Sequence, residues 1–352
     1  MHERLKKVFV SPGQSVKHVL KCMDSVGEKT VFVADGENRL LGSVTDGDIR
    51  RWILKGRSLT EDISLVMNPR PISLCDGLNQ DKIKEVMLKN ELGCLPIVDK
   101  SNRIVSAVWW IDLFKNRLIR KTPLKIPVVI MAGGEGVRLH PYTKILPKPL
   151  MPIGEKPIIE IIINKFHDRG CNDFYISLNY KSSLIKAYFN DLDHAYKITY
   201  AVESKPLGTI GSLRLLKNRL RRTFFVSNCD IVVDADYADM CRFHAQRKNK
   251  ITLVTSMKNF AIPYGICEIE NGGALKNIRE KPEYDFLVNT GMYVLEPSVI
   301  NDIPANKPYN ITDLIDDYLR KKKRIGVYPI SEKAWLDIGQ IEKMQDALRN
   351  IQ

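Results

Sequence analysis

A glycine-rich segment followed by an arginine and a lysine is the part of this sequence whose residue types most clearly suggest chemistry. Glycines let backbone N–H groups approach phosphate oxygens closely, and an arginine and a lysine can then neutralise a triphosphate. The spacing fits neither the G-x-G-x-x-G of dinucleotide-binding folds nor the G-x-x-x-x-G-K-[ST] of P-loops. We therefore expect a polyphosphate cradle of another kind. Its residues are Gly133, Gly134, Gly136, Arg138 and Lys148.

The pattern around these residues, G-G-x-G-x-R-L-x-P followed by P-K-P, resembles the signature of nucleoside-diphosphate-sugar pyrophosphorylases. The resemblance extends over residues 126–352 and implies a sugar-1-phosphate nucleotidylyltransferase. It makes Arg138 and Lys148 catalytic: the first contacts the β- and γ-phosphates of the triphosphate, and the second contacts the α-phosphate. Val137 departs from the family pattern, which more often has Thr or Ser at this position.

Further segments follow in the order of that family. The resemblance implies that the segment starting at Glu203 recognises the nucleobase, with Glu203, Gly208 and Thr209 as nucleotide-binding residues. The residues implied to bind the sugar phosphate are Tyr264, Gly265, Glu280, Lys281, Asn289 and Thr290.

Two aspartates from distant parts of the sequence are implied to hold one Mg²⁺ ion. Asp230 ends the segment Ser-Asn-Cys-Asp, and Asp337 lies in Trp-Leu-Asp-Ile-Gly. Mg²⁺ takes oxygen ligands and is usually held by one or two carboxylates while substrate phosphates complete its shell. We interpret the neighbouring Asp234 as a helix N-cap or a helper.

Glu203 is the residue that indicates which nucleobase the protein binds. A carboxylate offers two acceptors, and guanine presents N1–H and its 2-amino group side by side as donors, so GTP is favoured. The resemblance is closest to guanylyltransferases for glucosamine-1-phosphate that carry an N-terminal pair of cystathionine-β-synthase (CBS) repeats and serve legionaminic acid synthesis. Mannose-1-phosphate guanylyltransferase and glucose-1-phosphate thymidylyltransferase are the alternatives within the class. A non-catalytic nucleotide-sensing regulator is the alternative outside it.

Strands and helices alternate from residue 126 onward, which would position these motifs at strand ends. Helices of this length between strands imply a mostly parallel sheet covered on both faces, with ligands at the carboxyl ends of the strands. The predicted fold class is α/β, Rossmann-like and GT-A-like. The predicted strands are 128–131, 173–178, 197–202 and 224–228, and the predicted helices are 158–169, 182–189 and 212–220.

The first third of the chain contains two copies of one β-α-β-β-α unit, offset by 64 residues, since Asp35 corresponds to Asp99 and Asp48 to Asp112. This resembles a CBS pair. In that family a Thr and an Asp at the start of the last helix hold an adenine nucleotide, which makes Thr45 and Asp48 the candidate regulatory site. Trp109 replaces the hydroxyl in the second copy, so we expect one competent site per chain, or none. A pair that serves only dimerisation is the alternative.

The sequence thus predicts two α/β domains. The CBS pair is assigned to 1–118, with repeats at about 1–60 and 65–118, and the nucleotidyltransferase domain to 127–352. The segment 119–126 loses periodicity and contains Pro123, so we assign it as the linker.

Composition limits the partners. Seven scattered cysteines without a C-x-x-C spacing favour a reducing, cytoplasmic location, and no apolar run approaches the ~20 residues of a membrane span. The net charge of +13 favours anionic partners. Because no nucleic-acid-binding motif accompanies it, we expect a nucleoside triphosphate and a sugar-1-phosphate instead of nucleic acid or membrane, in a homo-oligomer.

Overall fold

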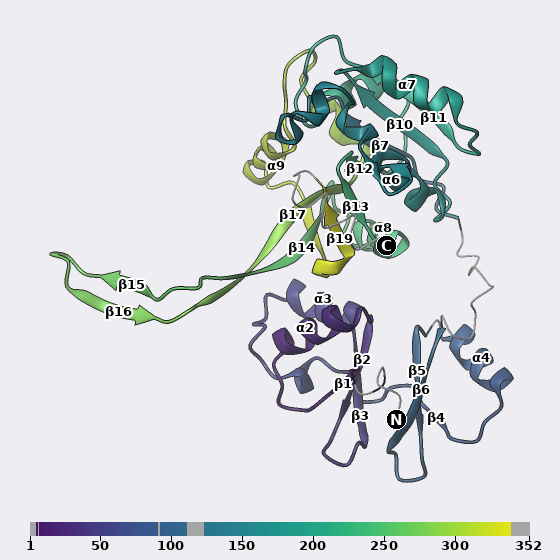
Figure 1. Cartoon of the computed structure of the whole chain (residues 1–352), viewed down its shortest axis with the longest axis vertical. Coiled ribbons are helices and arrows are strands. Elements are labelled where there is room, and N and C mark those ends of the chain that lie inside the picture. Colours follow the sequence, from purple (N-terminus) through teal and green to yellow (C-terminus); the bar gives the residue numbers. More distant parts are fainter. Residues whose placement is uncertain (1–4, 6, 91, 111–122, 339–352) are drawn as a thin grey trace. The chain divides into compact units, whose positions relative to one another are not determined.

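The computed structural model describes residues 5, 7–90, 92–110 and 123–338. The chain forms two compact units, Met1–Arg120 and Lys121–Gln352 (Figure 1). Residues 119–122 of the predicted linker, together with Asp112 and Gly339, lie outside the described residues. The longest described helix has 11 residues, and no helix within the described ranges is long and apolar enough to cross a membrane.

Unit 1 contains two three-stranded sheets of identical topology, each with a parallel pair followed by an antiparallel pair. The elements α2, β2 and β3 begin at residues 16, 30 and 40, and α4, β5 and β6 begin at 80, 94 and 104. The predicted offset of 64 residues is therefore confirmed. The elements are β1 (Phe9–Val10), α2 (Val16–Val26), β2 (Thr30–Ala34), β3 (Leu40–Thr45), α3 (Asp46–Leu54), β4 (Leu74–Cys75), α4 (Gln80–Lys89), β5 (Cys94–Val98) and β6 (Ile104–Trp109).

Unit 2 is built on a seven-stranded sheet in the order β11-β10-β7-β12-β17-β14-β18. Six of the seven strands run in one direction, and β17 alone runs antiparallel to its neighbours β12 and β14. The predicted mostly parallel α/β sheet is confirmed. Its strands are β7 (Val128–Ala132), β10 (Asp173–Leu178), β11 (Lys197–Val202), β12 (Phe224–Asn228), β14 (Ile251–Ala261), β17 (Glu283–Leu295) and β18 (Ile325–Ile330).

Both faces of this sheet are covered. Successive residues of a strand point to opposite sides, so neighbouring residues of β7 show what packs on each face. Val128 and Ile130 of β7 pack with α6 (Ile158–His167), α7 (Ser182–Asp191) and α8 (Tyr237–Gln246). Val129, between them, packs with the 3₁₀ turns η5 (Gly211–Leu216) and η6 (Pro297–Asp302) and with α9 (Ile311–Arg320) on the other face. All three valine and isoleucine side chains are fully buried.

The predicted helix at 212–220 was wrong, because the segment forms the shorter 3₁₀ turn η5. Its bonds run from residue i+3 to residue i, as from Leu213 N to Ile210 O and from Lys217 N to Arg214 O. A Cβ on Gly211 would lie 3.0 Å from the Cβ of Leu207 and 3.2 Å from Lys307 O, so the chain is closely packed where this segment begins.

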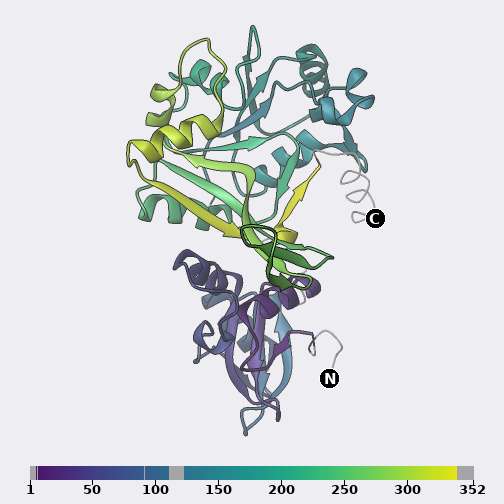
Figure 2. The same ribbon diagram turned by 90° about the vertical axis from the view of Figure 1, so that its left-hand side faces the viewer.

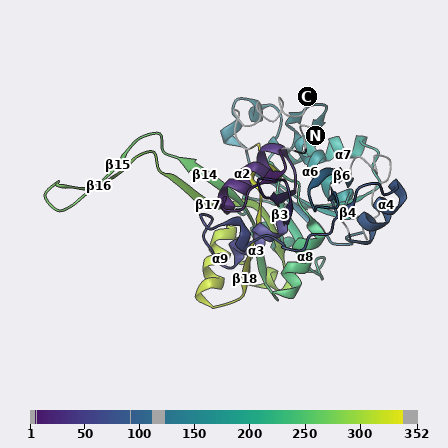
Figure 3. The same cartoon turned by 90° about the horizontal axis from the view of Figure 1, so that it is seen from below.

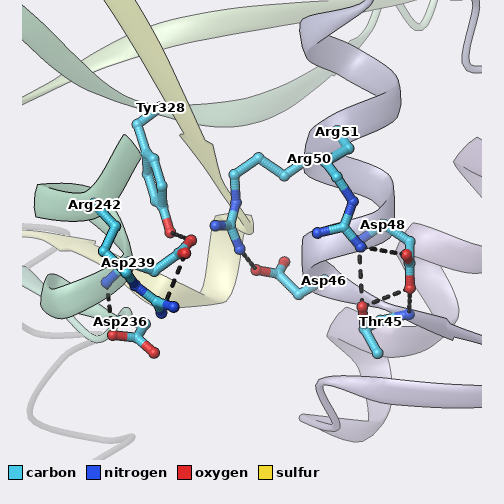
Figure 4. Close-up of polar contacts among 9 residues, drawn as sticks. All are labelled: Thr45, Asp46, Asp48, Arg50, Arg51, Asp236, Asp239, Arg242 and Tyr328. Atoms are coloured by element: carbon cyan, nitrogen blue, oxygen red, sulfur yellow. Dashed lines mark hydrogen bonds and ion pairs between the residues drawn. The ribbon is translucent and has the colours of Figure 1, made fainter. Parts of the chain in front are cut away.

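The N-cap prediction for Asp234 was also wrong. Asp236 caps α8, accepting hydrogen bonds of 3.0 Å from the backbone N–H groups of Ala238 and Asp239. Figure 4 shows Asp236 at the start of the helix. The next acidic residue, Asp239, is contacted by Tyr328 and Arg242. The Asp234 carboxylate instead lies 3.5 Å from Lys165 Nζ.

A long two-stranded ribbon leaves the sheet (Figures 1 and 3). Pairing of β14 with β18 ends at Ser256, but pairing with β17 continues to Ala261 and Glu283. The chain then forms a hairpin of β15 (Ile266–Ile269) and β16 (Leu275–Arg279). We name residues 257–287 the arm; Figure 2 views it from its tip. The sequence patterns did not predict it.

Candidate active site

The glycine-rich loop (residues 133–136) follows β7 directly and turns at Gly136 into η2 (Val137–Leu139). Gly136 has φ +68°, and a Cβ there would lie 3.0 Å from the Cβ of Lys148. Thr143 Oγ1 donates a hydrogen bond of 2.9 Å to its carbonyl oxygen. Gly136 is therefore required both for the left-handed turn and for the close approach of Lys148. Gly134 faces open space, and Arg138 is exposed.

Lys148, the first residue of η4 (Lys148–Leu150), forms an ion pair with Asp230. The two side chains are only 13% and 16% exposed. Asp230 lies in the turn between β12 and β13 (Ile231–Val233), so the pair joins the segment after the glycine-rich loop to the carboxyl end of β12. Because both side chains are largely shielded from water, removing either charge would leave the other buried without its partner, which is destabilising.

Asp337 lies on the neighbouring strand β19 (Trp335–Asp337). It pairs with Ile231, and Ile338 N donates a hydrogen bond of 2.9 Å to the carbonyl oxygen of Asp230. The two predicted metal ligands are therefore on adjoining chain segments. Within the described ranges no group of three His, Cys, Asp or Glu side chains gathers, so a cation here would have two carboxylates and would need ligands from substrate, as Mg²⁺ does.

Cys229, next to Asp230, is not a nucleophile. Burial, followed by the negative charge of Asp230, raises the pKa of its thiol to about 12. The thiol therefore stays protonated at neutral pH, and the thiolate is the reactive form.

The Asn-Thr-Gly segment of β17, residues 289–291, lies against the carboxyl end of β12, close to Asp230 in the sequence. Val254 of β14 pairs with Met292, but the next residue, Thr255, pairs with Asn289, so Thr290 and Gly291 bulge out of the ladder. Gly291 has φ +89°, and a Cβ there would lie 2.5 Å from Asn228 Nδ2 on β12. Thr290 is buried and donates 2.8 Å to Val254 O. A bulge of this kind bends the strand and re-aims its side chains.

Glu203, which we expected to recognise the nucleobase, forms hydrogen bonds with other residues of the protein. Its side chain is 7% exposed; Oε1 accepts a 2.6 Å hydrogen bond from Ser177 Oγ, and Oε2 accepts a 2.9 Å bond from Leu207 N. A Cβ on Gly133 would lie 2.8 Å from Oε1. Glu203 thus lies directly against the glycine-rich loop and holds the loop that carries Leu207.

Gly208 and Thr209 are fastened to the start of α9. Gly208 has φ +78°, and a Cβ there would lie 2.7 Å from Tyr309 O. Thr209 Oγ1 accepts a hydrogen bond of 2.9 Å from Ile311 N, which is one of the free donors of the first helical turn. This loop is consequently held at both ends, by Glu203 and by α9.

The sugar-phosphate residues divide into two groups. Asn289 and Thr290 lie at the sheet, whereas Tyr264, Gly265, Glu280 and Lys281 lie on the arm. The two arm segments lie against each other: a Cβ on Gly265 would lie 2.9 Å from Glu280 Oε2, and Ile262 N donates a hydrogen bond of 3.0 Å to Pro282 O. Tyr264 is 74% exposed.

Thr45 and Asp48 of unit 1 form a reciprocal helix cap at α3 (Figure 4). Thr45 N and Oγ1 donate to Asp48 Oδ2 at 2.8 and 2.6 Å, and Asp48 N donates to Thr45 Oγ1 at 3.2 Å. Arg51 pairs with the other carboxylate oxygen of Asp48. The capping box alone accounts for a Thr and an Asp at this spacing.

Three polar residues in these contacts were not chosen from the sequence. Ser177 and Asn179 reach Glu203 from the end of β10, and Asn228 lies against Gly291. Asn228 lies two residues before Asp230 in the Ser-Asn-Cys-Asp segment and could have been selected. Ser177 carries no such signal, because its role depends on which strand lies beside β10.

Comparison with known proteins finds a family match in each unit. Residues 127–352 match the model of the nucleotidyl transferase family, and residues 4–55 match the CBS domain. The chain is 31% identical over 222 residues to mannose-1-phosphate guanyltransferase of Saccharomyces cerevisiae and 32% identical over 224 residues to that of Debaryomyces hansenii. Each match covers 60% of this chain, and 61% and 60% of the respective relative.

Solved structures give the same fold. HddC from Yersinia pseudotuberculosis superposes with a TM-score of 0.52 at 24% identity, over 64% of this chain and all of the other. Its complex with GMP-PN gives 0.51 at 25% identity, with the same coverage. Proteins of this kind typically use a divalent metal ion. Because the family match covers more than half of its length, the chain belongs to the nucleotidyl transferase family.

Proposed function

We propose that this chain is a Mg²⁺-dependent hexose-1-phosphate guanylyltransferase. A phosphate oxygen of the sugar-1-phosphate attacks the α-phosphorus of GTP, the bond from that phosphorus to the β-bridging oxygen breaks, and pyrophosphate leaves with the electron pair. The products are a GDP-sugar and pyrophosphate. The sugar phosphate is already an anion at neutral pH, so no general base is required.

The observation that carries the proposal is the Lys148–Asp230 ion pair beside Gly136, with Asp337 on the adjoining strand. Lys148 supplies a positive charge for the α-phosphate, and the exposed Arg138 supplies one for the leaving pyrophosphate. Asp230 and Asp337 would hold Mg²⁺, which when bound neutralises phosphate charge. The non-catalytic alternative expects these residues to be lost, and all four are present.

GTP is favoured because the curated relatives are guanyltransferases and the HddC structure binds a guanine nucleotide analogue. Glu203 enters as a positioning residue, since both of its oxygens accept hydrogen bonds from the protein. For the sugar, the resemblance favours glucosamine-1-phosphate and the relatives favour mannose-1-phosphate. We further propose a cytoplasmic homo-oligomer.

The assay that tests the proposal measures pyrophosphate release with Mg²⁺. The four triphosphates plus dTTP are each combined with mannose-, glucosamine- and glucose-1-phosphate. GTP with mannose- or glucosamine-1-phosphate should give the highest kcat/KM. No release with any combination would refute the enzyme assignment, and a preference for dTTP with glucose-1-phosphate would refute the guanylyl assignment alone.

Replacing either metal carboxylate should nearly abolish turnover. Asp230→Asn and Asp337→Asn are each expected to lower kcat by roughly 100-fold or more, because an amide is a poor substitute for a carboxylate on Mg²⁺ and the metal supplies several kcal/mol. Asp234→Asn is the matched control, since that carboxylate pairs with Lys165 and should be dispensable. Melting curves would check folding. Near wild-type rates in both variants would contradict the metal assignment.

Glu203→Gln tests positioning against base reading. The amide cannot accept hydrogen bonds at both positions, so stability should fall by about 1–3 kcal/mol. Turnover should fall with GTP and dTTP alike and leave their kcat/KM ratio unchanged. Ser177→Ala, which removes one of the two bonds, should act in the same direction and more weakly. If Glu203→Gln narrows the ratio instead, Glu203 reads the base directly.

For the CBS domain we propose an adenine nucleotide bound near Thr45 and Asp48, with one competent site per chain. Support comes from the family match and from the Asp48 carboxylate beside Arg51, whose side chain is 66% exposed. Calorimetry with AMP, ADP and ATP should detect binding that Asp48→Ala weakens at least ~10-fold and that Asp35→Ala, at the opposite end of the β2–β3 hairpin, leaves unchanged. Absence of heat with all three would leave Thr45 and Asp48 as a helix cap only.

A further inference from the structure

The strand that carries Asp337 has little backbone support of its own. β19 has three residues, and within the described ranges it pairs only with β13, as a two-stranded sheet apart from the seven-stranded one. Short two-stranded pairings are marginally stable unless they pack against something else. Because a metal site requires its ligands at fixed positions, β19 needs further contacts to hold Asp337 beside Asp230.

One ammonium group supplies two of these contacts. Lys258 lies on β14, two residues beyond Ser256, at the base of the arm. Its Nζ atom forms an ion pair with Glu332 and lies 5.5 Å from the centre of the Trp335 ring. Glu332 begins η7 (Glu332–Ala334), which leads directly into β19 at Trp335. Lys258 therefore holds the entry to β19 from the side of β14 (Figure 1).

The orientation of the Trp335 ring depends in part on this cation. The indole N–H is buried and has no hydrogen-bond partner among the residues that the structure describes, so no hydrogen bond from the ring fixes it. The ring packs against the core cluster on the α8 face of the sheet. An ammonium group over an indole is attracted by the partial negative charge on the face of the ring. Packing and the Lys258 cation together therefore set the ring.

The position of Trp335 in turn affects that of Asp337. Residues two apart on a strand share a face, so the two side chains project from the same side of β19. The strand between them forms one continuous ladder with β13, without a bulge. A shift at the ring would therefore carry along the strand to the carboxylate.

The Lys258–Glu332 ion pair is too open to solvent to matter chiefly for folding. The two side chains are 30% and 46% exposed, and pairs of this kind contribute little to the free energy of unfolding. What the pair fixes is the relative position of two segments that are 74 residues apart. Its loss should therefore leave the chain folded and change the place of β19.

We propose that Lys258 is a positioning residue for the metal site. Through Glu332 and Trp335 it fixes β19, and so it holds the Asp337 carboxylate where it can share a cation with Asp230. The proposed function, on which this rests, makes the two aspartates the Mg²⁺ ligands. Groups that orient metal ligands from outside typically change metal affinity by roughly 10- to 100-fold when they are removed.

Binding of Mn²⁺ alone to the full-length protein tests this without turnover, because free Mn²⁺ is counted by its electron paramagnetic resonance signal. Lys258→Met removes the charge and keeps the length of the side chain, and it should raise the Kd for Mn²⁺ by roughly 10-fold. Lys258→Arg keeps a cation over the ring and should stay within about 2-fold of wild type. Glu332→Gln removes only the ion pair, so it should have a smaller effect in the same direction.

Lys323→Met is the matched control. Lys323 also combines an ion pair, with Asp302 at 2.7 Å, and a cation over an aromatic ring, 4.3 Å from the centre of the Tyr318 ring, but these partners belong to η6 and α9. Its loss should leave the affinity for Mn²⁺ unchanged. An equal loss of affinity in Lys323→Met, or wild-type affinity in Lys258→Met, overturns the proposal.

Asp337→Asn distinguishes failure of this proposal from failure of the proposed function. The variant should weaken Mn²⁺ binding more than Lys258→Met does, because it removes a ligand. Unchanged binding in Asp337→Asn, or no binding in wild type, would refute the metal assignment and the role of Lys258 with it. Weakened binding in Asp337→Asn but not in Lys258→Met overturns the role of Lys258 alone.

Turnover gives a second readout that a merely structural role would not produce. In Lys258→Met the Mg²⁺ concentration that gives the half-maximal rate should rise by the same factor as the Kd for Mn²⁺, while kcat at saturating Mg²⁺ stays within ~3-fold of wild type. A structural role predicts instead a lower kcat at every Mg²⁺ concentration, and that result overturns the proposal.

Discussion

The ion pair between Lys148 and Asp230 is the interaction on which the arrangement of the site depends. Two charges that are mostly removed from water are stable only together, so the pair fixes the segment after the glycine-rich loop against the end of β12. It can form because Gly136 has no side chain where Lys148 passes. The backbone bond from Ile338 to Asp230 then brings Asp337 to the same place. A single contact thereby links three distant segments.

The bulge in β17 and the fixed loop at 203–209 surround that pair with rigid backbone. Gly291 brings β17 against Asn228, and Glu203 lies against Gly133 from the side of β11. In both places a glycine permits a contact that any Cβ would block. Positioning of this kind suits phosphoryl transfer, in which the protein mainly holds reactants and neutralises charge. The glycines of the signature therefore act through packing as well as through access to phosphate.

The arm continues β14 and β17 as far as the pair Ala261–Glu283. Tyr264, Gly265, Glu280 and Lys281, which the family resemblance assigns to the sugar phosphate, lie between that ladder and the hairpin ladder of β15 and β16. Strand pairing is therefore interrupted where these four residues lie, and Lys281 there has φ +43°. These four residues are carried on the arm, outside the seven-stranded sheet, whereas Asn289 and Thr290 lie within it.

Patterns in the sequence were sufficient for the parallel sheet and for the two repeats of unit 1. The periodicity of buried residues is a property of neighbouring positions, and the 64-residue offset is found by comparing the sequence with itself. Sequence patterns also selected the residues that meet at the site, since Gly136, Lys148, Asp230 and Asp337 stand in recognisable motifs. Only the tertiary structure decided that Ser177 bonds Glu203 and that Tyr264, Gly265, Glu280 and Lys281 leave the sheet on an arm. Those outcomes depend on which strand lies beside which and on where a ladder stops. Such contacts join residues tens of positions apart, and the periodicity of a single segment carries no record of its partner.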